Sequence, residues 1–364
     1  MNPSSSSRLL ALSAEELNAH VEELIGGPII AAELVSESLG GLRYTWRIRS
    51  GSGTDYALKW TRDLSRQTQG GHNSTETEWS ALRLLYDQGA PVPRPIAARP
   101  ELGLLVTRWV EGETLDDRAQ EEPDSARAAL PEIVRALAMV DRALEVHRGE
   151  LGPYVYAMDY DAYLGEDFRR VLVEAWRGYR LLAERRSVPP EALESLRDLW
   201  RAVVEAVFQG TPRFGSLDYT ARNLLLTDSE PIVLDFSTLG WDWSERRLVQ
   251  YTTALGARRS DGNFVSLLNP EGLESCREAW FFHPEVLEAH HFVFLCLIAE
   301  RLLRHGIEPP SEEEGALHPA FWANRAARFH RVLKLLAQGT AWDFEPTRLL
   351  RERLREWYGD VADG

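Results

Sequence analysis

Residues 214–237 of this 364-residue chain read FGSLDYTARNLLLTDSEPIVLDFS. In this stretch Asn223 follows Asp218 by five residues, and two short apolar runs separated by a polar turn lead from Asn223 to Asp235. Short apolar runs bounded by turn residues predict buried strands. The pattern therefore predicts an ordered set of polar side chains at the ends of short strands.

Phosphoryl transfer requires a set of this kind, because its catalysis consists mainly of positioning and charge neutralisation. One carboxylate must orient the attacking hydroxyl, and two oxygen donors must hold magnesium against the phosphates. An Asp and an Asn five residues apart would be a weak signal alone. The Asp235-Phe236 pair, twelve residues after Asn223 with apolar runs between, makes the signal specific.

This segment resembles the catalytic and magnesium loops of the protein-kinase-like superfamily, and most of all its aminoglycoside phosphotransferase and choline kinase branch. The resemblance implies that Asp218 is the catalytic aspartate and that Asn223 and Asp235 bind magnesium. It also implies ATP and Mg²⁺ as cofactors. The implied fold is α+β and bilobal, with a small antiparallel-sheet N-lobe containing one long helix and a larger, mainly helical C-lobe.

The pattern of the remaining chain agrees with two lobes. Alternating and apolar runs predict strands, and residues spaced at 3.6-residue intervals predict helices. We expect an N-lobe over residues 1–110 and a helical C-lobe over 111–364, with the catalytic and magnesium loops at 214–240. The expected N-lobe strands are 32–36, 42–49, 56–60, 96–99 and 104–109, with helices at 11–25 and 74–88. The expected C-lobe helices are 125–147, 160–186, 190–208, 243–258, 284–305, 319–337 and 346–358.

Lysine usage singles out one position in the expected sheet. Lys59 and Lys334 are the only lysines among 41 basic residues. Lys334 belongs to an amphipathic helix and is expected to be exposed. Lys59 lies on the third expected strand, in a segment that resembles the strand whose lysine contacts the α and β phosphates. A surface lysine on an edge strand is the alternative interpretation.

The partner of such a lysine is a glutamate on the following helix, where Glu76 and Glu78 compete. Residues four and seven positions apart share one helix face. Glu78 therefore shares the apolar, inward face with Leu82 and Leu85, and we predict that Glu78 pairs with Lys59.

Two further segments are candidates for nucleotide contacts. The resemblance places Gly40 and Gly41, at the first hairpin, over the phosphates, where backbone amides can bind anions. It also makes residues 104–112 the strand and hinge between the lobes. The backbone around Arg108, Trp109 and Val110 would then meet the adenine edge, with Thr107 at the back of the pocket. An ordinary buried strand that ends in a glycine turn explains the hinge segment nearly as well.

The sequence departs from the family pattern at three places. The glycine-rich loop is reduced to Gly40-Gly41. Ser216 and Leu217 precede Asp218 where the family usually has His and then Gly or Arg, and Ser237 replaces the glycine after Asp235-Phe236. A pseudokinase or nucleotide-gated binding module is therefore one alternative to an active small-molecule kinase. A protein kinase is another, although no Ala-Pro-Glu motif follows Asp235.

Composition limits the partners. The net charge is −15, which argues against nucleic acid because phosphate neutralisation requires a basic face. The two cysteines have no metal-ligand spacing, and no apolar run is long enough to cross a bilayer, so we expect a cytoplasmic protein without a membrane partner. The sequence does not determine an oligomeric state.

The acceptor is expected to be the hydroxyl of a small molecule, with cationic and sugar-like molecules as the leading classes. Residues 111–364 carry 44 acidic against 30 basic residues, and carboxylates attract cationic substrates. A solvated acidic surface explains the same excess. Acidic residues and tyrosines mix between residues 154 and 167, which suits a cationic or sugar ring, although tyrosines in such a segment equally fit a core.

Overall fold

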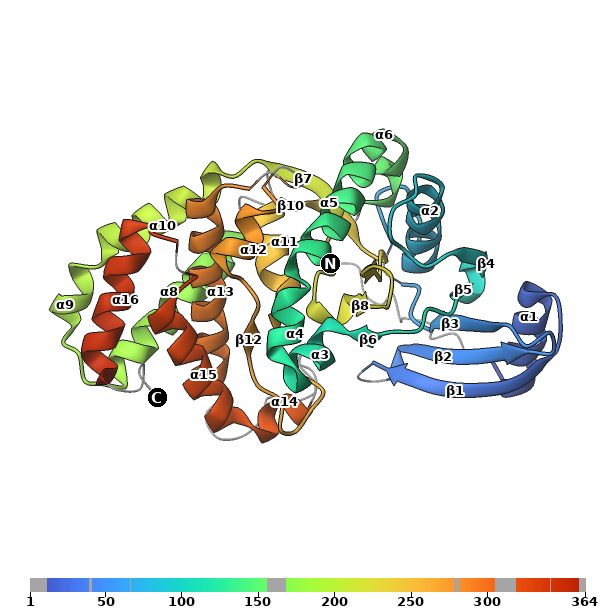
Figure 1. The fold of residues 1–364 in the computed structure, drawn as a ribbon, viewed down its shortest axis with the longest axis horizontal. Coiled ribbons are helices and arrows are strands. Elements are labelled where there is room, and N and C mark those ends of the chain that lie inside the picture. The colour runs from blue at the N-terminus through green and yellow to red at the C-terminus, as the bar shows by residue number, and fades with distance from the viewer. Residues whose placement is uncertain are drawn as a thin grey trace, which may run out of the picture.

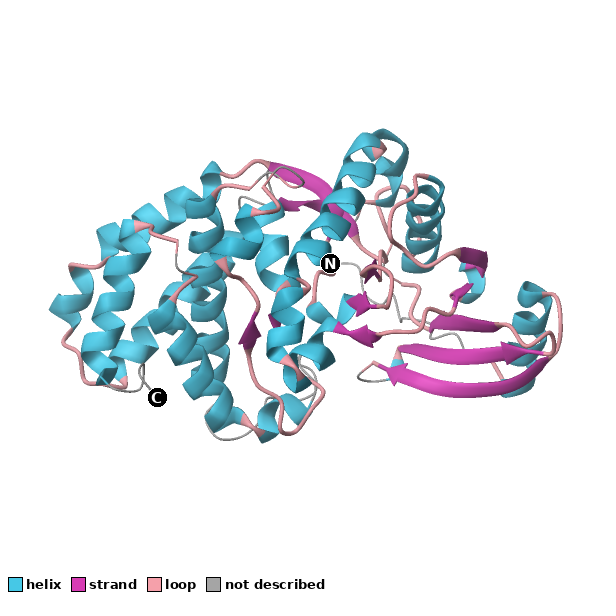
Figure 2. Ribbon diagram, in the orientation of Figure 1, coloured by secondary structure: helices cyan, strands magenta, loops and turns pink. Residues whose placement is uncertain are grey.

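The computed structural model describes residues 12–38, 41–65, 67–155, 168–277, 280, 282–304, 319–340 and 342–359. It confirms the expected α+β, bilobal architecture. Figure 1 shows the sheet with its helices on one side of the molecule and the long helices of the C-lobe on the other. Figure 2 shows that strands dominate the first lobe and helices the second.

The N-lobe is a five-stranded antiparallel sheet with strand order β1-β2-β3-β5-β4. Its elements are α1 (Ala14–Ile25), β1 (Ile29–Glu37), β2 (Arg43–Ser50), β3 (Asp55–Thr61), α2 (Ser74–Asp87), β4 (Pro95–Arg99) and β5 (Leu104–Arg108). Ser13 and Glu16 form both hydrogen bonds of a capping box at the start of α1, as their spacing predicts. Helix α1 packs Val21 into a small core with Ile48, Leu58 and Val106.

The chain passes from the sheet to the second lobe beside the segment quoted above. After β5, residues 109–112 lead into β6 (Glu113–Thr114), which pairs with β8 (Leu224–Leu226). Strand β8 in turn pairs with β9 (Ile232–Val233). Gly112 fits closely there, since a Cβ on it would lie 2.7 Å from the carbonyl oxygen of Leu226. The link between the lobes is therefore held against the strands that flank Asn223.

The second lobe is built around α13 (Pro284–Arg304), which is buried on nearly every side. Helix α8 (Phe168–Glu184) packs closely on it, because a Cβ on Gly178 would lie 2.0 Å from the carbonyl oxygen of Cys296. The other long helices are α5 (Leu130–Val146), α10 (Arg197–Gln209), α11 (Ser244–Tyr251), α15 (Arg325–Gln338) and α16 (Glu345–Tyr358). Short helices are α3 (Leu115–Glu121), α4 (Pro123–Ala128), α6 (Arg148–Leu151), α9 (Pro190–Glu194), α12 (Pro270–Glu274) and α14 (Pro319–Ala323).

Several expected helices differ from the structure. The helix expected over 243–258 ends at Tyr251, because Thr253–Ala254 (β11) pairs with Val265–Ser266 (β12) and Gly256 has φ +53°. The helices expected over 125–147, 190–208 and 319–337 are each divided in two. The expected start of the 160–186 helix lies outside the described residues. None of the described helices has the length and apolar character needed to span a bilayer.

Candidate active site

Two strand pairs hold the two loops of the 214–237 segment side by side. Strand β7 (Pro212–Ser216) pairs with β10 (Leu239–Trp243), and β8 pairs with β9 between them in the sequence. The first loop connects β7 to β8, and the second connects β9 to β10. The amide of Leu217 donates to the carbonyl of Thr238 at 3.0 Å, and the amide of Leu234 donates to the carbonyl of Asn223 at 2.8 Å. These bonds bring residues 217–223 and 234–238 together.

Lys59 lies between two carboxylates from different parts of the chain. Its Nζ is 2.6 Å from Glu78 Oε2 on α2 and 3.0 Å from Asp235 Oδ2 on the second loop. The three side chains are largely buried, with exposed fractions of 19%, 7% and 18%. Glu76 instead pairs with the ring of His72, at 2.8 Å. The structure therefore places Glu78, not Glu76, against the lysine.

The two carboxyl groups that share Lys59 have unequal pKa values. Burial raises the pKa of the Asp235 carboxyl, but the charges of Lys59 and Arg43 more than offset this, so its pKa lies below the usual range. Burial raises the pKa of Glu78 to about 7, and the attraction of Lys59 only partly opposes it. Burial lowers the pKa of Lys59, but Asp235 and Glu78 reverse the shift and keep it above its ordinary value. Lys59 and Asp235 are therefore the charged pair, and Glu78 takes up a proton first.

Asp235 is held in an uncommon backbone conformation. Its φ is +60°, in the left-handed region that Asp tolerates better than most residues. The amide of Ser237 donates to Asp235 Oδ1 at 3.1 Å, which fixes the carboxylate relative to its own backbone. The turn therefore directs one carboxylate oxygen to Lys59 and gives the other a single backbone donor.

Asp218 is half-buried near the start of the first loop. Asn223 Nδ2 donates to the Asp218 carbonyl at 2.7 Å, so the amide side chain braces the loop backbone. Burial, followed by the charge of Asp235, raises the pKa of Asp218 to about 6, while Lys59, Arg43 and Arg222 pull it down. The carboxyl is thus mostly ionised at neutral pH but more basic than an exposed aspartate, which suits a group that accepts a proton.

Oxygen donors in this arrangement fit magnesium. Asp235 offers a carboxylate, and Asn223, whose Nδ2 is engaged with Asp218, has its amide oxygen left for a ligand. The described residues contain no cluster of three or more His, Cys, Asp or Glu side chains that could hold a metal. Magnesium is commonly held by one or two protein oxygens together with substrate phosphates and water. Asn223 and Asp235 have the chemistry for such a site.

The predicted phosphate loop is only partly described. Gly40 lies outside the described residues. Gly41, in the turn between β1 and β2, has φ +62°, and a Cβ on it would lie 2.6 Å from the hydroxyl oxygen of Tyr44. Arg62 Nη1 donates to the Gly41 carbonyl at 3.3 Å. The turn therefore depends on glycine for its backbone conformation, whereas the tip of the Tyr44 side chain could shift to make room for a Cβ.

The predicted hinge residues follow the end of β5. Thr107 is buried and pairs with Ala57, and the exposed Arg108 pairs with Tyr56. The amide of Trp109 donates to the carbonyl of Asp55 at 3.2 Å. The amides of Arg108 and Trp109 are thus both used within the protein, since that of Arg108 donates to the carbonyl of Arg94 at 2.8 Å.

Sequence reasoning missed two arginines that act on this site. Arg43, at the start of β2, lowers the pKa of both Asp218 and Asp235 by its charge, and Arg222 lowers that of Asp218. The position of Arg222, directly before Asn223, was a usable signal. No sequence signal pointed to Arg43, because only the pairing of the strands brings this residue near the loops. Of the candidate acceptor segment 154–167, Tyr154 stacks on His72 with ring centres 4.3 Å apart, and residues 156–167 lie outside the described residues. Lys334, expected to be exposed, is half-buried.

A sheet lobe, a helical lobe and a lysine paired with two acids define the protein-kinase-like class of phosphotransferases. The model of the phosphotransferase enzyme family, APH, matches residues 40–261, which is more than half of the chain. The chain therefore belongs to this family, whose members include small-molecule phosphotransferases that act on hydroxyl groups.

Solved structures show the same fold. A spectinomycin phosphotransferase in complex with ADP and spectinomycin has 12% identity and a TM-score of 0.54, with 95% of this chain and 100% of that chain covered. A macrolide 2′-phosphotransferase from Brachybacterium faecium has 14% identity and a TM-score of 0.50, with 84% and 96% covered. No curated protein gives a significant match.

Proposed function

We propose that this phosphotransferase is an ATP-dependent, magnesium-requiring kinase that moves the γ-phosphoryl group to a hydroxyl of a small molecule. The observation that carries the proposal is the convergence of Lys59, Glu78 and Asp235, with separations of 2.6 Å and 3.0 Å, beside the loop of Asp218. Asp235 lies far from Lys59 and Glu78 in the sequence, and β3 is an inner strand of the sheet, whereas a surface lysine on an edge strand would not bring the three side chains together.

In this proposal Lys59 binds the α and β phosphates, and Glu78 holds the ammonium in place. Gly40 and Gly41 cover the phosphates, and the backbone from Arg108 to Val110 receives the adenine, with Thr107 behind it. Asn223 and Asp235 bind magnesium, which when bound neutralises phosphate charge. Because Asp235 keeps its charge through Lys59, it is ready to bind a cation over the whole physiological pH range.

Asp218 orients the acceptor hydroxyl and takes its proton. Its pKa of about 6 leaves most of it ionised at neutral pH, and its raised basicity favours proton transfer. Asn223 and Ser216 hold the Asp218 backbone, so the carboxylate keeps one position relative to Asp235. The chain's own residues thus supply the base, its orientation and the phosphate-binding cation.

The acceptor we propose is a small hydroxylated molecule of the cationic or sugar-like classes. Support comes from the acidic excess after residue 110 and from the solved relative that binds spectinomycin. The experiment is an ADP-release assay with Mg²⁺ and ATP across amino sugars, aminocyclitols, amino alcohols, neutral sugars and hydroxy acids. We expect one class to accelerate ADP release, and Asp218→Asn to reduce that rate about 100-fold or more.

Nucleotide binding must be measured alongside turnover. Mg-ATP should raise the melting temperature of both the wild type and the Asp218→Asn variant, because the substitution leaves Lys59 and Asp235 in place. A thermal shift with Mg-ATP but no acceptor-dependent ADP release from any class would instead support a nucleotide-gated binding module.

A further inference from the structure

A pocket of about 700 Å³ lies in the helical lobe, between α13, α14, α15, α16 and the turn that follows α8. Figure 1 shows α13, α15 and α16 on the side of the helical lobe that faces away from the sheet, with α14 nearer to α3 and α4. The volume is in the range of sites that hold small organic molecules. Nothing in the proposed phosphoryl transfer uses this pocket.

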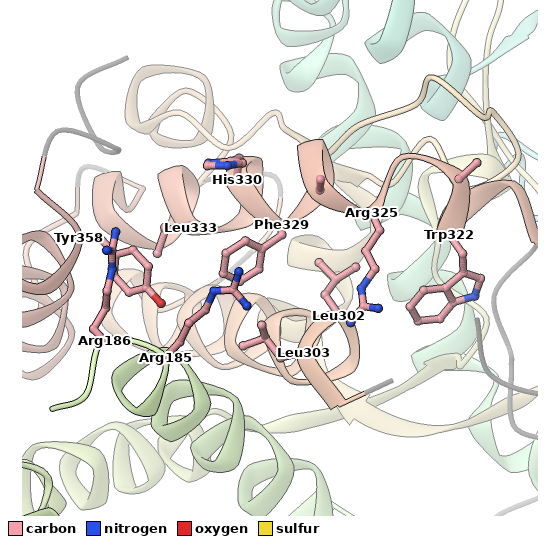
Figure 3. Close-up of a pocket in the computed structure, with 12 residues that line it drawn as sticks. Arg185, Arg186, Leu302, Leu303, Trp322, Arg325, Phe329, His330, Leu333 and Tyr358 are labelled. Carbon is pink, nitrogen blue, oxygen red and sulfur yellow. The ribbon is translucent and has the colours of Figure 1, made fainter. Parts of the chain in front are cut away.

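The walls of the pocket are apolar and aromatic. Leu302 and Leu303 come from α13, Phe329 and Leu333 from α15, and Tyr358 from α16. Figure 3 shows Leu302 and Leu303 between the side chains of Arg185 and Arg325, with Phe329 beside the guanidinium group of Arg185. Such a floor would bind a flat, apolar body by excluding water from both surfaces.

Three arginines line the same pocket, and each stacks on one of its aromatic rings. The guanidinium carbon of Arg185 is 5.4 Å from the ring centre of Phe329, and that of Arg186 is 4.4 Å from Tyr358. That of Arg325 is 5.9 Å from Trp322. Stacking of this kind holds a guanidinium group in place while its N–H groups stay available at the edge.

The three cations have no carboxylate partner, unlike about half of the arginines that the structure describes. No ion pair joins Arg185, Arg186 or Arg325 to a carboxylate among the described residues, whereas neighbouring Arg180 pairs with Glu184 at 3.2 Å. Arg325 Nη1 is buried without any hydrogen-bond partner. A buried, unpaired charged donor is costly, so an anion that pairs with it would be bound favourably.

The helix that carries Arg325 adds to the positive potential. Arg325 is the first residue of α15, a position where the helix dipole disfavours a cation. The first turn contains no acidic residue, and the side chain of Asn324 at the N-cap forms no capping bond. It donates instead to the carbonyls of Asp261 and Gly262. The uncapped helix start and the guanidinium groups therefore both favour a negative charge.

We propose that this pocket binds a small organic anion with a flat apolar body. Its anionic group lies between Arg185 and Arg325, and its body rests on Leu302, Leu303 and Phe329. The site is separate from phosphoryl transfer and does not depend on the function proposed above. Arg186 contributes charge from the Tyr358 side of the pocket.

The test uses the full chain and calorimetric titration with 2-naphthoate, 2-naphthalenemethanol and inorganic phosphate at constant ionic strength. Since a charge-assisted hydrogen bond contributes about 1.5 kcal/mol or more, naphthoate should bind at least about tenfold more tightly than the neutral alcohol. Arg185→Gln and Arg325→Gln, singly and together, should weaken naphthoate binding by a similar factor or more. Arg180→Gln on the same helix is the matched control and should leave it unchanged.

Four outcomes would overturn the proposal. The alcohol or phosphate alone could bind as tightly as naphthoate, or Arg180→Gln could weaken binding as much as the pocket variants. Saturating Mg-ATP could displace naphthoate, which would place it in the nucleotide site. Finally, naphthoate could bind only after glutamates 312–314 are replaced by glutamine. That result would identify the chain's own acidic residues as the occupants of the pocket. Melting curves establish that each variant is folded before it is titrated.

Discussion

Ser216, two residues before Asp218, connects the two loops of the proposed active site. Its hydroxyl accepts a hydrogen bond from the Asp218 amide at 3.2 Å and donates one to the Asp235 carbonyl at 3.3 Å. The side chain is buried, and the residue is only 3% exposed. Ser216→Ala therefore removes the one side chain that bonds to the backbone of both aspartates in the part of the chain that the structure describes.

The size of the effect follows from these distances. A typical protein hydrogen bond contributes about 0.5–1.5 kcal/mol. Here the bond from the hydroxyl to the Asp235 carbonyl is longer than the usual O–H···O range, and the bond from the Asp218 amide lies at the upper end of the N–H···O range. We therefore take the lower half of that range for each and expect Ser216→Ala to lower the free energy of unfolding by about 1–2 kcal/mol. A similar loss of loop positioning would lower kcat about tenfold, since about 1.4 kcal/mol corresponds to a factor of ten. The KM for ATP should change little, because Lys59 keeps both of its partners.

Ser237 provides the matched control. It is also buried, at 2% exposure, but its hydroxyl has no hydrogen-bond partner. Its amide, which donates to Asp235 Oδ1, is unaffected by substitution of the side chain. Ser237→Ala should therefore leave the free energy of unfolding unchanged or raise it by up to about 1 kcal/mol, because it removes an unsatisfied buried group. Urea unfolding and steady-state kinetics of both variants form the assay, and equal losses in the two would refute the positioning role of Ser216.

Three further perturbations test the electrostatics and backbone of the site. With Asp218 as the base and a pKa of about 6, kcat should fall as the pH drops below about 6, approaching tenfold per unit, and this acidic limb should vanish in the residual activity of Asp218→Asn. Burial raises the pKa of Glu78 to about 7, so the folded state binds the Glu78 proton more tightly than the unfolded state. The free energy of unfolding should therefore fall as the pH rises between about 4.5 and 7. In urea unfolding experiments, Glu78→Gln should lack this part of the pH dependence. Gly41→Ala should raise the KM for ATP and cost about 1 kcal/mol or more in unfolding free energy, because φ is +62° there; an unchanged KM would separate this turn from the nucleotide.

The sequence was most informative where local patterns decide the structure. The strands of the first lobe begin and end within three residues of their expected bounds, since alternation and glycine turns determine them. The inward face of α2 could be recognised from the spacing of Leu82 and Leu85, which led to Glu78. The helix expected over 243–258 failed for the opposite reason. Apolar residues continue past Tyr251, but the backbone of Thr253–Ala254 pairs with Val265–Ser266 as a strand and cannot continue the helix.

Contacts between distant segments could not be predicted in this way. Ser216 was recognised only as a departure from the family pattern, because its bond to Asp235 depends on how β7 and β10 pair. The charge of Arg43 reaches Asp218 through the sheet, across more than 170 residues of sequence. Arg185 and Arg325 likewise line one pocket only because α8, which precedes Arg185, and α15 both pack on α13. The hydrophobic pattern locates each helix. Which charged side chains meet depends on where each lies around its helix axis and on which elements pack beside that helix.

The use of lysine at position 59 has a physical explanation in the geometry of the site. Arginine presents a planar, forked set of donors that matches one carboxylate, whereas an ammonium is a compact charge whose three donors can serve separate acceptors. Lys59 contacts Glu78 and Asp235, which come from different lobes, and the proposed nucleotide phosphates would be a third acceptor. A guanidinium group would pair with one acid and leave the other buried and uncompensated. In a chain that otherwise uses arginine almost throughout, a lysine at this position indicates a cation that must be shared.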